Sequence, residues 1–308
     1  MKFKKRILPL GFYDLKSNQA HKNYLLTHQA IDNFLRQGYE LYKTSLIEFA
    51  DNFDKNFTTN SFNFLDPLTQ KNVFIRQDIT TQISQIVASN YHNFSDIKKI
   101  CYYGDVINLK SEDLYSERQK TQVGCEIIGS NSVTDCFTVI KDTLCGLSSI
   151  KGLSITLSLP DFYNEIIENT KIAHNEKIFT AITQKQISTI SSITPKYSEI
   201  INEIILHNNF EKLNSKIRQF FPTPKINKMM NDAEELVNLL KTNFTDLIIN
   251  FDAFGDTNFN YHNKIVFDIF AQNSRYAIAK GGCYNIKSEN ANIPAVGSTI
   301  YINFLLKI

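Results

Sequence analysis

The chain has 308 residues and a net charge of +2, with 33 lysine and arginine residues against 31 aspartate and glutamate residues. This length corresponds to one large domain or two small ones, and it is enough to bury a core without disulfides or metals. A content of 43% hydrophobic and 21% charged residues is typical of a globular protein and excludes a disordered or fibrous one. The small net charge gives no support for binding to nucleic acid or to an acidic membrane.

The cysteines and the first residues bear on the cellular compartment. The five cysteines are odd in number and form no C-x-x-C pair, which argues against a disulfide framework and a structural zinc site. No apolar run reaches the roughly 18 residues of a transmembrane helix. The start, from Met1 to Leu10, briefly resembles a signal peptide, but Pro9, Gly11 and Asp14 interrupt it and no cleavage site follows. We therefore expect a cytoplasmic protein with free thiols.

Helices and short strands are predicted to alternate in the first ninety residues. Apolar residues at three- and four-residue spacing predict an amphipathic helix over 18–38, with Gly38 at its C-terminal cap. Asp78 is placed to cap a second helix. The other predicted elements are a strand over 39–47, a loop over 48–60, a strand ending in a turn over 62–67, a strand over 72–76 and that second helix over 78–89.

The rest of the chain is predicted to form a sheet interrupted by one long helical stretch. Residues 160–245 show helical spacing, with prolines separating the pieces, which predicts a mostly helical insertion or subdomain. Because hairpins dominate and regular βαβ alternation is absent, we expect an α+β fold with a mainly antiparallel sheet. The predicted elements are an antiparallel hairpin of strands 100–108 and 122–128, a helix over 132–147, and strands over 153–159, 246–251, 265–270, 276–279 and 295–302.

Two polar clusters are candidate ligand sites. Residues 76–80, Arg-Gln-Asp-Ile-Thr, lie at a strand-to-helix junction, where backbone N–H groups can hold a ligand. The alternative is a helix cap with Arg76 in a surface ion pair. In the second cluster, Gln122 and Glu126 project from one face of a strand, with Gly124 between them leaving room for a ligand. The alternative is the solvent-facing polar side of a half-buried sheet.

A third cluster is Lys280-Gly281-Gly282-Cys283-Tyr284, predicted to lie at a strand end. Its paired glycines permit either close approach of another backbone or a tight turn, and the turn is the simpler interpretation. No P-loop, dinucleotide-binding or metalloprotease motif is present, and no two of the six histidines have ligand spacing. We therefore expect no metal and no cofactor. The residues alone predict an α+β protein with a small-molecule pocket.

Short motifs along the chain carry a family resemblance. In order they are Leu8-Pro9-Leu10-Gly11-x-x-Asp14, Gly38-Tyr39 with Thr44-x-Leu46-x-Glu48, Arg76-x-Asp78-x-Thr80, Tyr103-Gly104-Asp105-Val106, Arg118 with Gln122-x-Gly124-x-Glu126, Tyr261-x-x-x-Ile265-Val266-Phe267, Gly281-Gly282-Cys283-Tyr284-Asn285 and Pro294-Ala295-Val296-Gly297. Together they resemble the catalytic core of histidyl-tRNA synthetase and of its non-charging paralogue, the regulatory subunit of ATP phosphoribosyltransferase. The resemblance covers about 7–150 and 246–308.

The resemblance implies one class II aminoacyl-tRNA synthetase-like core over 1–308, an antiparallel sheet flanked by helices, with 160–245 as the helical insertion. The motif that begins at Gly38 forms the dimer interface in the family, so a self-dimer is expected. The chain stops soon after the motif that begins at Pro294, so no anticodon-binding domain and no tRNA binding are expected.

Four positions depart from the synthetase pattern. Asn108, Thr257, Cys283 and Phe304 stand where the family carries arginines that contact ATP or the amino acid. Each arginine neutralises phosphate or carboxylate charge, and losing one such donor typically costs about 10²–10³ in rate. The resemblance with these departures therefore implies a protein without aminoacylation activity.

The same resemblance implies a surviving histidine pocket formed by Asp78, Thr80, Gln122, Glu126 and Tyr261. Carboxylate oxygens of Asp78 and Glu126 would receive the ammonium or imidazole group of histidine. Which cation receives the ligand carboxylate stays open between Arg76 and Arg118.

The expected function is that of a non-catalytic regulatory subunit in the first step of histidine biosynthesis. Such a subunit assembles with the short catalytic subunit of ATP phosphoribosyltransferase, supports its activity and contributes to feedback inhibition by L-histidine. Two alternatives stay open: a divergent paralogue that acts on an RNA or protein partner, and an enzyme that adenylates an amino acid.

Overall fold

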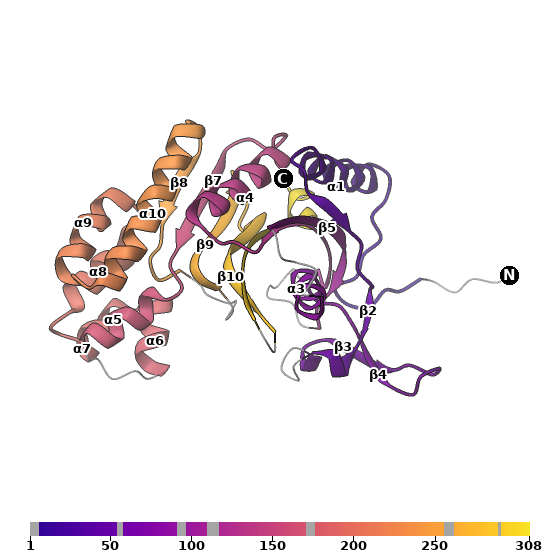
Figure 1. The fold of residues 1–308 in the computed structure, drawn as a ribbon, viewed down its shortest axis with the longest axis horizontal. Coiled ribbons are helices and arrows are strands. Elements are labelled where there is room, and N and C mark those ends of the chain that lie inside the picture. Colours follow the sequence, from indigo (N-terminus) through magenta and orange to yellow (C-terminus); the bar gives the residue numbers. More distant parts are fainter. Residues whose placement is uncertain are drawn as a thin grey trace.

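An eight-stranded sheet with the order β1-β5-β6-β11-β10-β9-β7-β8 organises the chain (Figure 1). The computed structural model describes residues 6–53, 58–90, 97–109, 117–170, 176–255, 262–288 and 291–308. Neighbouring strands are antiparallel except at the two edges, where β1 pairs with β5 and β7 with β8 in parallel. The predicted α+β fold with a mainly antiparallel sheet is confirmed. The strands are β1 (Glu40–Tyr42), β5 (Lys98–Ile107), β6 (Gln119–Ile128), β7 (Leu153–Ser158), β8 (Ile248–Phe251), β9 (His262–Ala271), β10 (Ala279–Lys287) and β11 (Asn292–Tyr301).

Two helices, α1 (Asn18–Arg36) and α4 (Val133–Gly146), cover one face of this sheet (Figure 1). Their apolar side chains join those of β6 and β11 in one continuous buried cluster. The chain leaves α1 through Gly38, whose φ of +83° is a conformation that side chains with a Cβ rarely adopt. The predicted glycine cap is therefore confirmed. Ser132 caps α4 by accepting a hydrogen bond from the backbone N–H of Asp135.

The opposite face of the sheet carries a single described helix, α3 (Thr80–Ser89), which lies inside the curve of the strands (Figure 1). Ile79, Ile83 and Val87 pack there against a second buried cluster that includes Tyr102 and Tyr284. The predicted helix thus begins two residues later than expected, after Asp78. Its N-terminus points to the middle strands of the sheet, and this position determines where polar side chains gather.

A separate three-stranded sheet of order β2-β4-β3 extends from the main body on the side of the N-terminus (Figure 1). Its strands are β2 (Ile47–Phe49), β3 (Phe62–Leu65) and β4 (Asn72–Ile75), and a short 3-10 helix, η1 (Ala50–Asn52), follows β2. The single strand predicted over 39–47 is wrong, because β1 and β2 belong to different sheets. Between them, the carbonyl group of Thr44 accepts a hydrogen bond from the Arg76 side chain, and Ser45 Oγ bonds to the backbone of Ile47. The loop predicted over 48–60 is also wrong at its start, because 48–49 belong to β2 and 50–52 to η1.

Six helices are described between β7 and β8, outside the undescribed residues 171–175, and they confirm the predicted helical character of this stretch. They lie to one side of the sheet (Figure 1), and their apolar residues belong to the same buried cluster as α1, α4 and the sheet. Phe210 of the insertion contacts Phe251 of β8 with ring centroids 5.1 Å apart. The helices are α5 (Phe162–Thr170), α6 (Glu176–Thr183), α7 (Ile187–Ile193), α8 (Ser198–Leu206), α9 (Phe210–Phe220) and α10 (Pro224–Asn243). The last described helix of the chain, α11 (Ile302–Leu305), follows β11.

The strand predicted over 276–279 is wrong, and so is the turn predicted for Lys280–Tyr284. Ser274 Oγ bonds to both backbone groups of Tyr276, so the turn lies earlier, and β10 begins at Ala279. The two glycines lie in the middle of β10, between β9 and β11. A Cβ at Gly281 would lie 2.3 Å from the carbonyl oxygen of Gly297, so close approach of the backbone explains that glycine.

None of the described helices is long and apolar enough to cross a membrane.

The shared core makes a prediction about the insertion. Phe210→Ala removes a buried ring between α9 and β8, so we expect a loss of about 3–5 kcal/mol in the free energy of unfolding, measured with urea at fixed protein concentration. Phe220→Ala is the matched control on the same helix, because Phe220 is 55% exposed, and it should change the value by less than about 0.5 kcal/mol. A wild-type transition in two steps, with Phe210→Ala shifting only one, would show that the insertion unfolds independently.

Candidate functional site

A small cavity lies where the N-terminus of α3 meets β6, β10 and β11 on the open face of the sheet. Its volume is about 30 Å³, room for about two water molecules at roughly 10–15 Å³ each. We call it the acidic cavity, because Asp78 and Glu126 both line it. All three clusters noted in the sequence contribute to it. Its lining residues are Asp78, Thr80, Glu126, Lys280, Gly281, Tyr284, Gly297, Ser298, Thr299 and Tyr301.

The carboxylate of Glu126, on β6, is the central group of the acidic cavity. The side chain is fully buried, and its two oxygens accept hydrogen bonds from the hydroxyls of Tyr284 (2.9 Å) and Tyr102 (3.1 Å). Burial raises the pKa of Glu126 from 4.5 to about 8, against the two tyrosine hydrogen bonds, which lower it. The Asp78 charge raises it further. Glu126 is therefore largely protonated at neutral pH.

The hydroxyl of Tyr102 connects Glu126 to neighbouring elements. It lies 2.7 Å from Thr80 Oγ1 at the start of α3 and 3.0 Å from Thr299 Oγ1 on β11. Burial raises the pKa of Tyr102 well above its usual value, so this hydroxyl keeps its proton. Three elements that are far apart in the sequence thus converge on one carboxylate.

Two glycines make room for protein side chains in this network. A Cβ at Gly297 would lie 1.5 Å from Glu126 Oε2, so only glycine leaves space for that carboxylate. A Cβ at Gly124 would lie 2.3 Å from the Tyr102 ring. The expectation that Gly124 leaves room for a ligand is therefore wrong, because the tyrosine ring fills the space. Both glycines are needed to bury the tyrosine–carboxylate network against the sheet.

Asp78 lines the cavity at the beginning of α3, and Gln122, which is not a lining residue, hydrogen-bonds beside it. Asp78 Oδ2 accepts hydrogen bonds from the backbone N–H (2.9 Å) and the hydroxyl (3.0 Å) of Thr81, so the predicted cap is confirmed. Burial raises the pKa of Asp78 above its usual value. Gln122 Oε1 accepts a hydrogen bond from the Ile79 backbone N–H at 3.3 Å, which fixes the helix start to β6. Two carboxyl groups in one buried site favour a cationic ligand.

Arg76 is not a lining residue of the acidic cavity, and its guanidinium donates hydrogen bonds to backbone carbonyl groups. Its Nε donates to the carbonyl oxygen of Asp105 at 2.8 Å and its Nη1 to that of Thr44 at 3.1 Å. A Cβ at Gly104 would lie 2.1 Å from Arg76 Nη2, so this glycine makes room for the guanidinium. The buried guanidinium joins β1, β4 and β5, which is not the surface ion pair considered from sequence.

Arg118 lies away from the acidic cavity, between two aromatic rings. Its guanidinium carbon is 4.5 Å from the ring centroid of Phe62 and 5.3 Å from that of Phe12. Its Nε also donates to the carbonyl oxygen of Asn108 at 3.2 Å. These contacts join the N-terminal segment to the three-stranded sheet. Tyr261, also expected in the pocket, lies outside the described residues, as does Thr257.

Three positions at which the family resemblance expects arginines now have defined surroundings. Phe304 stacks on Tyr276 with ring centroids 5.1 Å apart, and the Lys120 ammonium lies 5.5 Å from its ring centroid. Cys283 is buried on the α4 side of the sheet, where its free thiol forms a hydrogen bond with the free thiol of Cys136. Asn108 donates its backbone N–H to the Arg118 carbonyl oxygen at 2.8 Å. Neither the Phe304 ring nor the Cys283 thiol supplies a positive charge.

Sequence reasoning missed Tyr102, Tyr284 and Gly297 as parts of the site. Tyr284 and Gly297 were noted only as members of motifs, and Tyr102 was not noted. The missing information was register: Gly124 lies opposite Tyr102 and Thr299, and Glu126 lies opposite Gly297. A glycine opposite a tyrosine and another opposite a buried glutamate are the signals that a correct register would have revealed.

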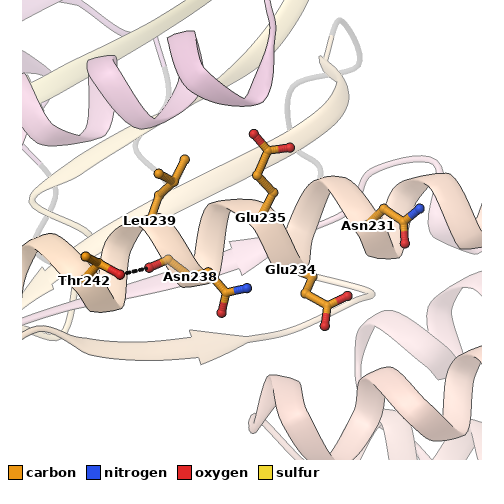
Figure 2. Close-up of a pocket in the computed structure, with 6 residues that line it drawn as sticks. All are labelled: Asn231, Glu234, Glu235, Asn238, Leu239 and Thr242. Atoms are coloured by element: carbon orange, nitrogen blue, oxygen red, sulfur yellow. Dashed lines mark hydrogen bonds between the residues drawn. The ribbon is translucent and has the colours of Figure 1, made fainter.

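A larger depression of about 510 Å³ lies on α10, lined by Asn231, Glu234, Glu235, Asn238, Leu239 and Thr242 (Figure 2). All six residues come from one helix, and all but Leu239 are exposed. Its acidic side chains are solvated, and Glu234 pairs with Arg218 at 3.0 Å. We favour the acidic cavity as the functional site, because burial of ionisable groups has a cost that a solvated surface does not carry. Among the described residues, no group of three or more His, Cys, Asp or Glu side chains is arranged to hold a metal ion.

Comparisons with known proteins place these features in a family context. The family model described as histidyl-tRNA synthetase matches residues 11–305. An ATP phosphoribosyltransferase regulatory subunit from Hahella chejuensis is 24% identical over 98% of this chain and 79% of its own length. The solved ATP phosphoribosyltransferase regulatory subunit/histidyl-tRNA synthetase from Bacillus halodurans has a TM-score of 0.85 at 16% identity, covering 99% of this chain and 84% of that one. The ATP phosphoribosyl transferase complex from Thermotoga maritima contains a chain with a TM-score of 0.72 at 17% identity, covering 91% of this chain and 97% of that one.

The raised pKa of Glu126 predicts a pH dependence of stability. Because the folded chain holds this proton up to about pH 8 and the unfolded chain releases it near 4.5, the stability contributed by the proton is lost as pH rises between these values. The slope for one such group approaches about 1.4 kcal/mol per pH unit. Glu126→Gln removes the titrating group and therefore this slope. The free energy of unfolding of the variant, relative to that of wild type, should then increase from pH 5 to pH 8 in urea unfolding. A difference that stays constant across this range would contradict the assignment.

Proposed function

Because the chain belongs to the histidyl-tRNA synthetase family, we propose that it is a regulatory member of that family, the regulatory subunit of an ATP phosphoribosyltransferase. The observation that carries the proposal is sequence similarity, over 98% of the chain, to a protein named ATP phosphoribosyltransferase regulatory subunit. In this role it acts in the first step of histidine biosynthesis, in the cytoplasm. It assembles with the short catalytic subunit, which joins ATP to phosphoribosyl pyrophosphate, and it supports that subunit's activity.

The chain itself carries out no aminoacylation in this proposal. Phe304 and Cys283 occupy positions where a synthetase of the family needs arginines, and neither side chain is a cation that could neutralise phosphate. Adenylation develops negative charge in its transition state, and two missing donors would together cost several orders of magnitude in rate. These residues argue against the alternative of an adenylating enzyme. The net charge of +2 argues against an RNA-binding paralogue.

L-Histidine is the proposed effector, and the acidic cavity is its proposed site. Asp78 and Glu126 supply carboxyl groups for a cationic amine or imidazolium, and Thr80, Gln122 and Tyr261 complete the proposed pocket. Arg76 and Arg118 hold the surrounding backbone, which leaves the ligand carboxylate to another cation. Because the cavity holds only about 30 Å³ and ligand pockets span roughly 300–1,000 Å³, histidine enters only if the cavity widens.

Widening gives a physical route to feedback. Histidine stabilises the conformation with the wider cavity, and it regulates the complex if that conformation has a different affinity for, or effect on, the catalytic subunit. A coupling free energy of about 1–3 kcal/mol corresponds to a change of roughly 5- to 150-fold, enough for feedback control.

A self-dimer is the second assembly that we propose, through one face of the three-stranded sheet. Cross-strand register places Ile47, Phe49, Phe62, Phe64, Val73 and Ile75 on this face. We call it the apolar sheet face. Phe12 and Arg118 cover its Phe62 end. Ile47, Phe49 and Phe64 are 45%, 37% and 42% exposed.

The regulatory proposal is tested by mixing. The short catalytic subunit from the same organism should gain ATP phosphoribosyltransferase activity on addition of this chain, and L-histidine should suppress that activity. Glu126→Ala should raise the histidine concentration for half-inhibition by at least about tenfold, because it removes a charge-assisted contact. The chain alone should give no amino-acid-dependent ATP–pyrophosphate exchange. If mixing changes neither activity nor the size of the assembly, the proposed partnership is wrong.

The dimer proposal is tested by sedimentation. Phe64→Asp places a charge on the apolar sheet face, so we expect the dimer to dissociate at micromolar concentration. Phe220→Asp, a similarly exposed phenylalanine on α9, is the matched control and should leave the dimer intact. A wild-type monomer, or a dimer that survives Phe64→Asp, would exclude this face.

A further inference from the structure

Lys280 is a positive charge on the wall of the acidic cavity. It lies on β10, directly opposite Thr299 of β11 on one side and Asp268 of β9 on the other. Directly opposed residues project from the same face of a sheet. Because Thr299 bonds to the Tyr102 hydroxyl, which bonds to Glu126, Lys280 shares its face with the buried carboxylate network.

The present ion pair of Lys280 is loose. Its Nζ lies 3.8 Å from Asp268 Oδ1, beyond hydrogen-bond distance, and the two side chains are 32% and 36% exposed. Pairs of this kind contribute little to stability, since water competes for both charges. The three N–H donors of Lys280 can therefore turn to a ligand at small cost.

The neighbouring arginines cannot take that role without losing structural contacts. Arg76 donates to the carbonyl groups of Asp105 and Thr44, and Arg118 lies between the rings of Phe62 and Phe12. Of the described residues that line the acidic cavity, Lys280 alone carries a positive charge. The cavity thus has one basic wall and a floor with two carboxyl groups.

Opposite charges at two ends of one cavity match a zwitterion. We propose that Lys280 binds the carboxylate of a free amino acid whose ammonium group faces Asp78 and Glu126. This inference rests on the proposed function and names the residue that its histidine site requires. Lys280 and Glu126 stand two strands and two residues apart, so their Cα atoms are separated by roughly 12 Å. Lys280 and Glu126 project from the same face of the sheet, so in the widened cavity their charged ends face the two ends of one small ligand.

This arrangement makes the ligand carboxylate a determinant of specificity. Histidinol has the ammonium and imidazole groups of histidine but no carboxylate. It would leave Lys280 with only its loose Asp268 partner, so the protein should bind it more weakly than L-histidine. A site formed only by Asp78 and Glu126 would not make this distinction.

The test is calorimetric titration of the full chain with L-histidine and with histidinol. Lys280→Met should weaken histidine binding by about 10- to 100-fold, the change expected for loss of one charge-assisted contact. Histidinol binding should be unchanged by this substitution. Lys287→Met, at an exposed position on the same strand, is the matched control and should bind both ligands like wild type. Asp268→Asn removes the competing carboxylate and should tighten histidine binding.

The outcomes separate the two levels of the proposal. If the wild-type chain and its complex with the catalytic subunit fail to bind L-histidine, the proposed effector site is wrong. If wild type binds histidine and Lys280→Met binds it equally well, only the role of Lys280 is overturned. Equal weakening of histidine and histidinol in Lys280→Met would show a structural role, and weaker histidine binding in Asp268→Asn would also contradict a carboxylate contact.

Discussion

One buried carboxylate, that of Glu126, constrains the rest of this structure. A fully buried acid is stable only when its oxygens are hydrogen-bonded, and here the hydroxyls of Tyr102 and Tyr284 supply both bonds. Glycine is required at 297, where any side chain would displace the carboxylate, and at 124, where the Tyr102 ring lies. The register of β5, β6, β10 and β11 and the position of α3 follow from bringing these groups together. Such a network would be costly to retain in a core that needed only stability.

The proposed site would allow a synthetase fold to bind an amino acid without activating it. Binding requires carboxylates for a cation and a cation for a carboxylate, and Asp78, Glu126 and Lys280 provide both on one face of the sheet. Activation requires further positive charge for phosphate, and Phe304 and Cys283 lie where that charge is expected from the family. The proposed site would have the charges for recognition and lack two of those for adenylation, in keeping with the proposed regulatory role.

Sequence patterns predicted more of the fold than of the candidate site. Helical spacing located α1, α3, α4 and the helical insertion, because each buries one apolar stripe, and alternation located the β5–β6 hairpin. The division between β1 and β2 was missed, since hydrogen bonds from Arg76 to distant carbonyl groups determine it. Gln122, Glu126 and Asp78 were found from residue type and spacing. Lys280 was read as part of a turn because paired glycines suggest one, and only the pairing with Gly297 and Ser298 shows them inside a strand.

The most direct test of the account is the proton balance of histidine binding. The pKa of Glu126 is raised to about 8 by burial, so at pH 7 the group is mostly protonated and must ionise to receive a cationic ligand. Titration calorimetry at pH 7 in buffers of different ionisation enthalpy measures the protons exchanged. The account predicts release of a proton by wild type and a smaller release by Glu126→Gln. Histidine binding with the same proton exchange in both proteins would contradict it.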